Sequence, residues 1–232
     1  MENIIQYYEN YDEDGRLFRD NAHKIEYLTT IHYFDRLFTP SSRILDVCAG
    51  TGRYSFYLAN KGHSVTACDL VEHNVNIIKS KPNASILAEI SVCNALDLSR
   101  FEKNSFDVVL CMGALYHLSS NGLKEKALSE CVRVCKSGGI VAFTYVIGSL
   151  EDRFKDIFFC STPCEIEEIA VKCGLKRKHN LCAGGNAGDN ANSLNEANDE
   201  DFQKYMKRHY LTCEDESLIE AGGLGLWIGI KK

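Results

Sequence analysis

The residues best suited to chemistry lie in a glycine-containing turn that follows a short apolar run. Residues 43–48 read Arg-Ile-Leu-Asp-Val-Cys, and the turn continues through Ala49 to Gly50, Thr51 and Gly52. Glycine has no Cβ, so the backbone of such a turn can approach a ligand closely. A helical pattern follows, and the free N–H groups at a helix N-terminus attract anionic or carboxylate groups. We therefore expect a ligand-binding turn between the first strand of a sheet and the helix after it.

An acidic residue ends the next strand-like run. Residues 64–68 read Ser-Val-Thr-Ala-Cys, and Asp69 follows them, 17 positions after Gly52. In doubly wound folds, an acid at about this spacing binds the hydroxyls of a ribose. The turn and the acid together predict a cofactor that contains a nucleoside.

Three cofactors compete for such a turn. A nucleoside triphosphate favours GxxxxGK(S/T), and no lysine follows the glycines in that way. A dinucleotide favours GxGxxG, but Ser55 takes the third glycine position and the bulky Tyr54 precedes it. Asp46 would repel a pyrophosphate, whereas it suits the cationic ammonium and sulfonium groups of S-adenosylmethionine. The residues favour S-adenosylmethionine, with an NAD-dependent dehydrogenase of degenerate turn as an alternative.

Several segments resemble motifs of the class I S-adenosylmethionine-dependent methyltransferases, whose fold is Rossmann-like. The segment ILDVCAGTGRYSFYLANKGHSVTACDL is similar to the family's first motif and the acidic strand after it, and FDVVLCMGALYHL to its fourth strand and the following loop. Residues 94–98 resemble the adenine-contacting segment, and residues 130–139 the usual helix-to-strand turn. The resemblance covers about residues 40–147. It departs from the family at Cys48, where the first glycine is usual, and at Asn94, where an acid is usual.

The resemblance implies cofactor-binding roles for ten residues. The site of the methionine end would be shaped by Asp46, Ala49, Gly50 and Gly52 in the first turn. The ribose would be bound by Asp69, and the adenine by Leu70, Asn94 and Ala95 in the next two loops. The sulfonium would be flanked by Met112 and Gly113, which follow the fourth strand.

Two further sets of residues are candidates for substrate chemistry. Tyr116 and His117 follow the fourth strand and would point toward the transferred methyl group. We hypothesise that His117 is a base or positions the acceptor; a histidine hydrogen-bonded at a helix start is the structural alternative. Families of this type use the N-terminal helix as a lid, which implies that aromatic and cationic residues there bind substrate. These residues are Tyr7, Tyr8, Tyr11 and Arg16.

Alternating strand-like and helix-like segments must position these residues. Strands are expected at 43–48, 64–68, 88–93, 106–111, 140–146, 175–182 and 224–230, with helices between them. This pattern predicts an α/β fold with a doubly wound, mostly parallel seven-stranded sheet and helices on both faces. We expect residues 1–40 to form a small helical N-terminal cap and residues 41–232 the Rossmann-like domain. Thr162, Pro163 and Glu165 have the spacing of a helix start, and the Gly/Asn/Ser-rich residues 184–198 are typical of a loop.

Charge and composition limit the classes of acceptor and binding partner that we expect. The formal net charge is −6, which argues against a broad nucleic-acid surface, and no apolar run is long enough to span a membrane. Residues 111–114 read Cys-Met-Gly-Ala instead of the Asp/Asn-Pro-Pro-Tyr/Phe that amino-methyltransferases use on nucleic-acid bases and protein glutamine. We expect a small-molecule acceptor with an O, N or S nucleophile, no nucleic-acid or membrane partner, and a monomer or homodimer. A regulatory protein that holds the cofactor without turning it over is the alternative from another functional class.

The eleven cysteines are scattered without CxxC spacing. Several lie in apolar runs, among them Cys68, Cys93 and Cys111, where a free thiol behaves as a small hydrophobe. With no histidines at zinc-site spacing and no N-terminal targeting signal, we expect free thiols, no metal and a reducing, cytoplasmic location.

Overall fold

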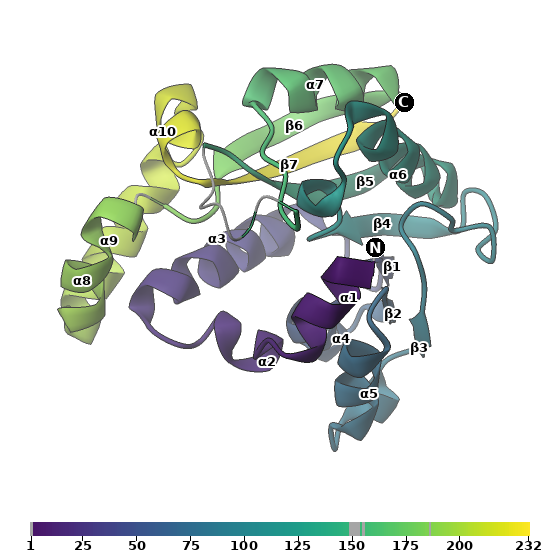
Figure 1. Ribbon diagram of the computed structural model, residues 1–232, viewed down its shortest axis with the longest axis horizontal. Coiled ribbons are helices and arrows are strands. Elements are labelled where there is room, and N and C mark those ends of the chain that lie inside the picture. Colours follow the sequence, from purple (N-terminus) through teal and green to yellow (C-terminus); the bar gives the residue numbers. More distant parts are fainter. Residues whose placement is uncertain (1, 149–153, 155, 186) are drawn as a thin grey trace.

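Seven strands form one sheet in the order β3-β2-β1-β4-β5-β7-β6 (Figure 1). The computed structural model describes residues 2–148, 154, 156–185 and 187–232. The strands are β1 (Arg43–Asp46), β2 (Ser64–Asp69), β3 (Glu89–Val92), β4 (Phe106–Cys111), β5 (Cys135–Val146), β6 (Leu175–Cys182) and β7 (Leu224–Lys231).

The sheet is mixed. Strands β3, β2, β1, β4 and β5 pair in parallel, whereas β7 runs antiparallel to both β5 and β6. The chain builds outward from β1 to β2 and β3, then returns to place β4 on the other side of β1. This reversal makes the carboxyl ends of β1 and β4 the switch point, where ligands bind in open α/β sheets.

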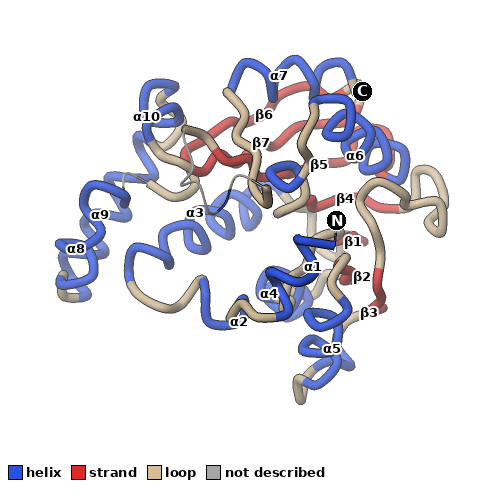
Figure 2. The backbone as a smooth tube through the Cα atoms, in the orientation of Figure 1, coloured by secondary structure: helices blue, strands red, loops and turns tan. Residues whose placement is uncertain are grey.

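Helices cover both faces of the sheet (Figures 1 and 2). They are α1 (Glu2–Glu9), α2 (Glu13–Arg16), α3 (Asn21–Leu37), α4 (Arg53–Asn60), α5 (Glu72–Ser80), α6 (Asn121–Val134), α7 (Pro163–Lys172), α8 (Ala187–Glu196), α9 (Asp199–Thr212) and α10 (Glu216–Ala221), with short 3₁₀ turns at Ala84–Ile86 and Leu115–His117. Successive strand residues face opposite sides: Leu45 packs in the core with Leu128 of α6, and Ile44 in the core with Phe34 of α3. Two buried layers therefore hold β1 and its turn rigidly in place.

The expected start of α7 is confirmed. Thr162 is the N-cap, Pro163 opens the helix, and the Thr162 and Glu165 side chains each bond the other's backbone N–H. Residues 138 and 139, expected to form a turn before the fifth strand, lie inside β5 instead. That strand runs back to Cys135, which pairs with Phe106 across the irregular end of the ladder.

The expectation of a loop at 184–198 is wrong, because α8 occupies most of it. The helix is stabilised by contacts with α3: Leu194 packs against Ile25, and the Asn21 amide donates to the Leu194 carbonyl at 3.0 Å. Figure 2 shows α8 beside α9 at the far end of α3. Local composition predicted a loop here, and tertiary packing overrode it.

The expectation that Cys68 and Cys93 are free thiols is also wrong. The two residues form a disulfide between the carboxyl ends of β2 and β3, with their Cα atoms 5.6 Å apart. Their positions in apolar runs suggested simple packing, but the pairing of the two parallel strands brings them together. Across the described parts of the chain, no helix has the length and apolar character needed to cross a membrane.

Candidate cofactor and acceptor site

The glycine turn lies between β1 and α4, above the switch point. Gly50 and Gly52 have φ values of +53° and +86°, a region that residues with a Cβ rarely adopt. The Ala49 N–H donates to the Cys68 carbonyl, and Gly52 is the N-cap of α4. A Cβ at Gly50 would come within 3.3 Å of the Glu13 side chain, so the turn is closely covered from α2.

Asp46 lies behind this turn and is 1% exposed. The Ser55 hydroxyl donates to its Oδ2 at 2.6 Å, while its Oδ1 has no hydrogen-bond partner among the described residues. Burial, and secondarily the charge of Asp69, raises the pKa of Asp46 to about 7. A nearby cationic group would stabilise this carboxylate.

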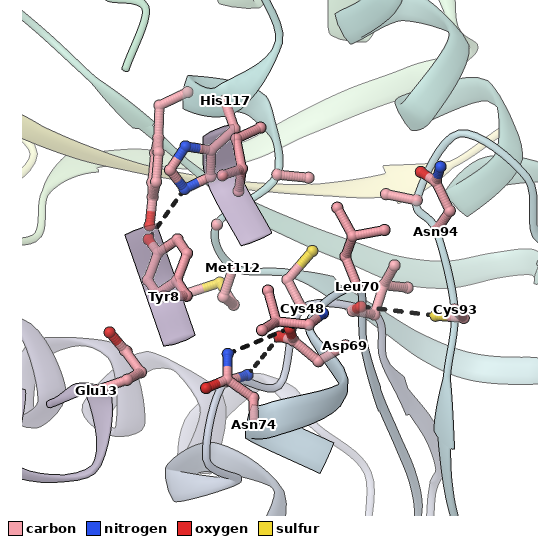
Figure 3. A pocket seen from close by; sticks show the side chains of 18 of the residues that line it. Tyr8, Glu13, Cys48, Asp69, Leu70, Asn74, Cys93, Asn94, Met112 and His117 are labelled. Carbon is pink, nitrogen blue, oxygen red and sulfur yellow. Dashed lines mark hydrogen bonds between the residues drawn. The ribbon is translucent and has the colours of Figure 1, made fainter. Parts of the chain in front are cut away.

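Three hydrogen-bond donors hold the Asp69 carboxylate in place in the cavity. Its Oδ2 accepts the Gly50 N–H at 2.8 Å, and its Oδ1 accepts the Val71 N–H at 2.9 Å and the Asn74 amide at 3.3 Å (Figure 3). Burial nevertheless raises the pKa of Asp69 above its ordinary value. An acid fixed in this way at the end of β2 is oriented to accept hydrogen bonds from a ligand diol.

Gly50 and Asp69 line a cavity that is partly open to solvent and whose wall is formed by the loops that follow β1, β2, β3 and β4 together with α1 and α2. Of the predicted residues, its wall includes Gly50, Asp69, Leu70, Asn94, Ala95, Met112, Gly113, Tyr116, His117, Tyr8 and Arg16. It does not include Asp46, Ala49 or Gly52, which shape the turn from behind, nor Tyr7 and Tyr11. Wall residues for which the sequence predicted no role are Ile4, Glu13, Val47, Cys48, Val71, Asn74, Cys93, Leu96, Ala114 and Leu118.

Asn94 partly serves its own loop. Its Oδ1 accepts the Leu96 N–H at 2.9 Å, which closes a turn immediately after β3. The turn presents residues 93–96 to the cavity, opposite Leu70 (Figure 3). The apolar side chains there provide a surface suited to a planar base.

Tyr8 of α1 contacts His117 in the wall of the cavity. The Tyr8 hydroxyl lies 3.0 Å from His117 Nε2, and His117 Nδ1 lies 2.8 Å from the Ile157 carbonyl (Figure 3). A carbonyl oxygen can only accept, so Nδ1 carries its proton and Nε2 accepts the Tyr8 O–H. Burial lowers the pKa of His117 to about 4, so the imidazole is neutral at pH 7.

The other N-terminal candidates lie differently. Tyr7 and Tyr11 stack on each other with ring centroids 5.3 Å apart, and Tyr7 packs edge-on against Phe158. Arg16 reaches the cavity, but its guanidinium is paired with both Glu26 oxygens, at 2.6 and 3.0 Å, and with Glu13 at 3.1 Å. Two carboxylates therefore surround the one cation in this part of the wall.

Comparison with known proteins agrees with this geometry. A family model described as a methyltransferase domain matches residues 45–143, from β1 into β5. A protein solved in complex with the Haloferax volcanii Trm112 methyltransferase activator shares the fold, with a TM-score of 0.70 and 17% identity over 98% of this chain and 96% of that one. The segment from β1 into β5 is similar to a methyltransferase domain, and the chain as a whole shares the fold of solved S-adenosylmethionine-dependent methyltransferases.

Curated relatives match only the central part of this chain. The S-adenosyl-L-methionine-dependent Diels-Alderase iccD of Talaromyces variabilis is 35% identical over 109 residues, which are 45% of this chain and 36% of that protein. Probable tRNA methyltransferase 9B of Bos taurus is 31% identical over 100 residues, which are 43% of this chain and 20% of that protein. The match thus spans less than half of each relative's length.

The residues of the cavity fit S-adenosylmethionine, the cofactor named for the Talaromyces relative. The cavity carries a fixed carboxylate at Asp69 for a diol, apolar walls for a base, and a turn in which Gly50 has a positive φ and would bring a Cβ against the Glu13 side chain. The unpartnered Oδ1 of Asp46 places negative charge behind the turn, where the methionine ammonium is expected.

Proposed function

We propose that the protein transfers the methyl group of S-adenosylmethionine to a small-molecule acceptor with an O, N or S nucleophile. The observation that carries the proposal is one cavity whose wall includes both the Asp69 carboxylate and the neutral, accepting Nε2 of His117. The first would hold the nucleoside, and the second would meet the acceptor.

When bound, S-adenosylmethionine supplies an electrophilic methyl group for in-line displacement. The protein's own part is alignment and exclusion of water, which can lower the barrier by several kcal/mol. Tyr8 and Tyr116 border the acceptor side, and Tyr8 would release His117 Nε2 when an acceptor O–H or N–H takes its place. An imidazole with a pKa of about 4 accepts a hydrogen bond at neutral pH but is a weak base, so we assign His117 to positioning of the acceptor.

His117→Ala is therefore expected to lower kcat/KM about tenfold, the effect of one lost hydrogen bond, instead of the roughly 10²–10⁴-fold expected for a general base. Below its folded pKa of about 4 the imidazole is charged, and above it the imidazole is neutral, so His117 adds no pH dependence between pH 6 and 9. Steady-state kinetics of the wild type, His117→Ala and the milder Tyr8→Phe across that range check this. Full activity of His117→Ala with unchanged cofactor affinity would show that His117 has no role in the reaction.

We also propose that α1 and α2 act as a lid. Besides the Tyr8–His117 contact, Asp14 accepts from Lys81 Nζ at 2.6 Å and pairs with Arg53 at 3.2 Å, which fastens α2 to the body of the domain. S-adenosylhomocysteine is expected to slow tryptic cleavage after Arg16, Arg19 and Lys24 about tenfold, because a filled cavity adds contacts to the closed lid. Cleavage after the exposed Lys204 of α9, away from the cavity, should not change. Equal cleavage of the N-terminal sites with and without the ligand would contradict the lid.

The relatives suggest two other functions. The tRNA methyltransferase suggests an RNA acceptor, and the Diels-Alderase suggests a protein that uses S-adenosylmethionine without methyl transfer. A net charge of −6, which argues against a broad nucleic-acid surface, favours the small molecule. A methyl-release assay over phenols, amines, thiols and total tRNA separates the three. Turnover of a small acceptor supports the proposal. Turnover of tRNA alone would contradict it and assign an RNA acceptor. Cofactor binding without turnover on any acceptor would favour a protein that does not transfer the methyl group.

A further inference from the structure

Asn74 is a buried polar residue of the cavity wall. It lies in the first turn of α5, is 2% exposed, and is next to Asp69 in Figure 3. Its Nδ2 donates to Asp69 Oδ1 at 3.3 Å. Its Oδ1 has no hydrogen-bond partner among the described residues.

The orientation of this amide follows from its neighbour. The Asp69 carboxylate already accepts N–H groups from Gly50 and Val71, so the group of Asn74 that faces it must be the NH₂ donor. The Asn74 oxygen is thereby left as an acceptor in the cavity wall. Buried acceptors are nearly always satisfied, and an unsatisfied one destabilises the folded state. Because Asn74 lies in the cavity wall, a ligand in the cavity can supply the missing donor.

The position of Asn74 selects which part of the ligand supplies that donor. The adenine-facing residues 94–96 follow β3, and the glycine turn follows β1, whereas Asn74 and Asp69 lie together between them after β2. A ribose placed against Asp69 carries two vicinal hydroxyls, and each of them can donate. Resting on the proposed cofactor, we propose that Asn74 is a second ribose-binding residue, whose Oδ1 accepts a hydrogen bond from one hydroxyl while Asp69 binds the diol.

The test compares ligands as well as variants. Calorimetry would measure binding of S-adenosylhomocysteine and of its 2′-deoxy and 3′-deoxy analogues to the wild type and to Asn74→Leu, which keeps the branch at Cγ and removes both the acceptor and the donor to Asp69. Asn74→Leu is expected to bind S-adenosylhomocysteine about tenfold more weakly. For one deoxy analogue, the variant and the wild type should bind within about twofold of each other, because the contacted hydroxyl is absent. Asn76→Leu, an exposed asparagine of the same helix, is the matched control and should bind like the wild type.

Thermal unfolding without ligand completes the test. The melting temperature of Asn74→Leu should change little, because the substitution removes both an unsatisfied buried oxygen and the hydrogen bond that Nδ2 donates to Asp69. An equal loss of affinity for all three ligands would mean that Asn74 acts only by orienting Asp69, and would overturn the inference. An unchanged affinity for S-adenosylhomocysteine would overturn it as well. Failure of the wild type to bind S-adenosylhomocysteine would overturn the proposed function itself, and this inference with it.

Discussion

Asp69→Asn is expected to weaken S-adenosylhomocysteine binding by on the order of 100-fold. The substitution removes the charge and turns one acceptor oxygen into an NH₂ donor, so hydrogen bonds from the ribose hydroxyls are lost or opposed. Hydrogen bonds to a charged group contribute about 1.5–3 kcal/mol each, and the loss of one or two gives a factor of this size. Calorimetric titration of both proteins measures it directly.

The control for Asp69→Asn must separate ligand contact from damage to the turn, because the Gly50 and Val71 N–H groups also bond this carboxylate. Circular dichroism and the melting temperature of the unliganded variant monitor the fold. Asp199→Asn, in the exposed first turn of α9, is the matched substitution and should leave the affinity unchanged. Tight binding retained by a folded Asp69→Asn variant would exclude Asp69 as the ribose ligand.

Asp46→Asn is expected to stabilise the unliganded protein while it weakens cofactor binding about tenfold. Burial raises the pKa of Asp46 from 3.8 to about 7, so the folded state holds this proton over a pH range in which the unfolded state has released it. The stabilising contribution of the protonated form is complete below the unfolded value of 3.8 and is lost as the pH rises through about 7. Above pH 7 the buried charge costs on the order of 4 kcal/mol, which the neutral amide avoids.

Urea unfolding of the wild type and Asp46→Asn at pH 5 and pH 8 checks the stability part. The variant's excess in free energy of unfolding over the wild type should grow between pH 5 and pH 8, and a variant that is less stable at pH 8 would contradict the assignment.

Cofactor binding should instead favour the wild type as the pH rises. Wild-type affinity for S-adenosylhomocysteine should improve as Asp46 ionises around pH 7, whereas Asp46→Asn should lack this step. Ser55→Ala, which removes the bond that lowers the pKa of Asp46, should move the step to higher pH.

The parts of the fold that the sequence predicted are those with strong local patterns. The apolar run of strand length predicted β4 at its observed bounds, and the capping residues predicted the start of α7. The turn with Gly50 and Gly52 located the site, because its spacing reports a backbone conformation that few other residues can adopt. Helix α8 could not be predicted in this way, since its stability depends on contacts with α3, more than 150 residues earlier in the chain.

Single polar side chains in the site escaped prediction for the same reason. Asn74 and Glu13 have no repeat or spacing that marks them, and only the closure of the sheet and of α2 brings them to the cavity. The N-terminal tyrosines show how helix phase decides the outcome. Ile4 and Tyr8, four residues apart, share the face of α1 that lines the cavity, while Tyr7 turns toward Tyr11 and Phe158. The i, i+4 spacing of an apolar and an aromatic residue was the signal that could have selected Tyr8.

The central claim is that the cavity above β1 and β4 binds S-adenosylmethionine through the Gly50 turn and Asp69. Calorimetric titration of the wild-type protein at pH 8 with S-adenosylhomocysteine, and separately with NAD, tests this claim most directly. We expect one molecule of S-adenosylhomocysteine to bind per chain at micromolar or tighter affinity and NAD to give no binding heat. Binding of NAD, or the absence of S-adenosylhomocysteine binding by folded protein, would contradict the claim.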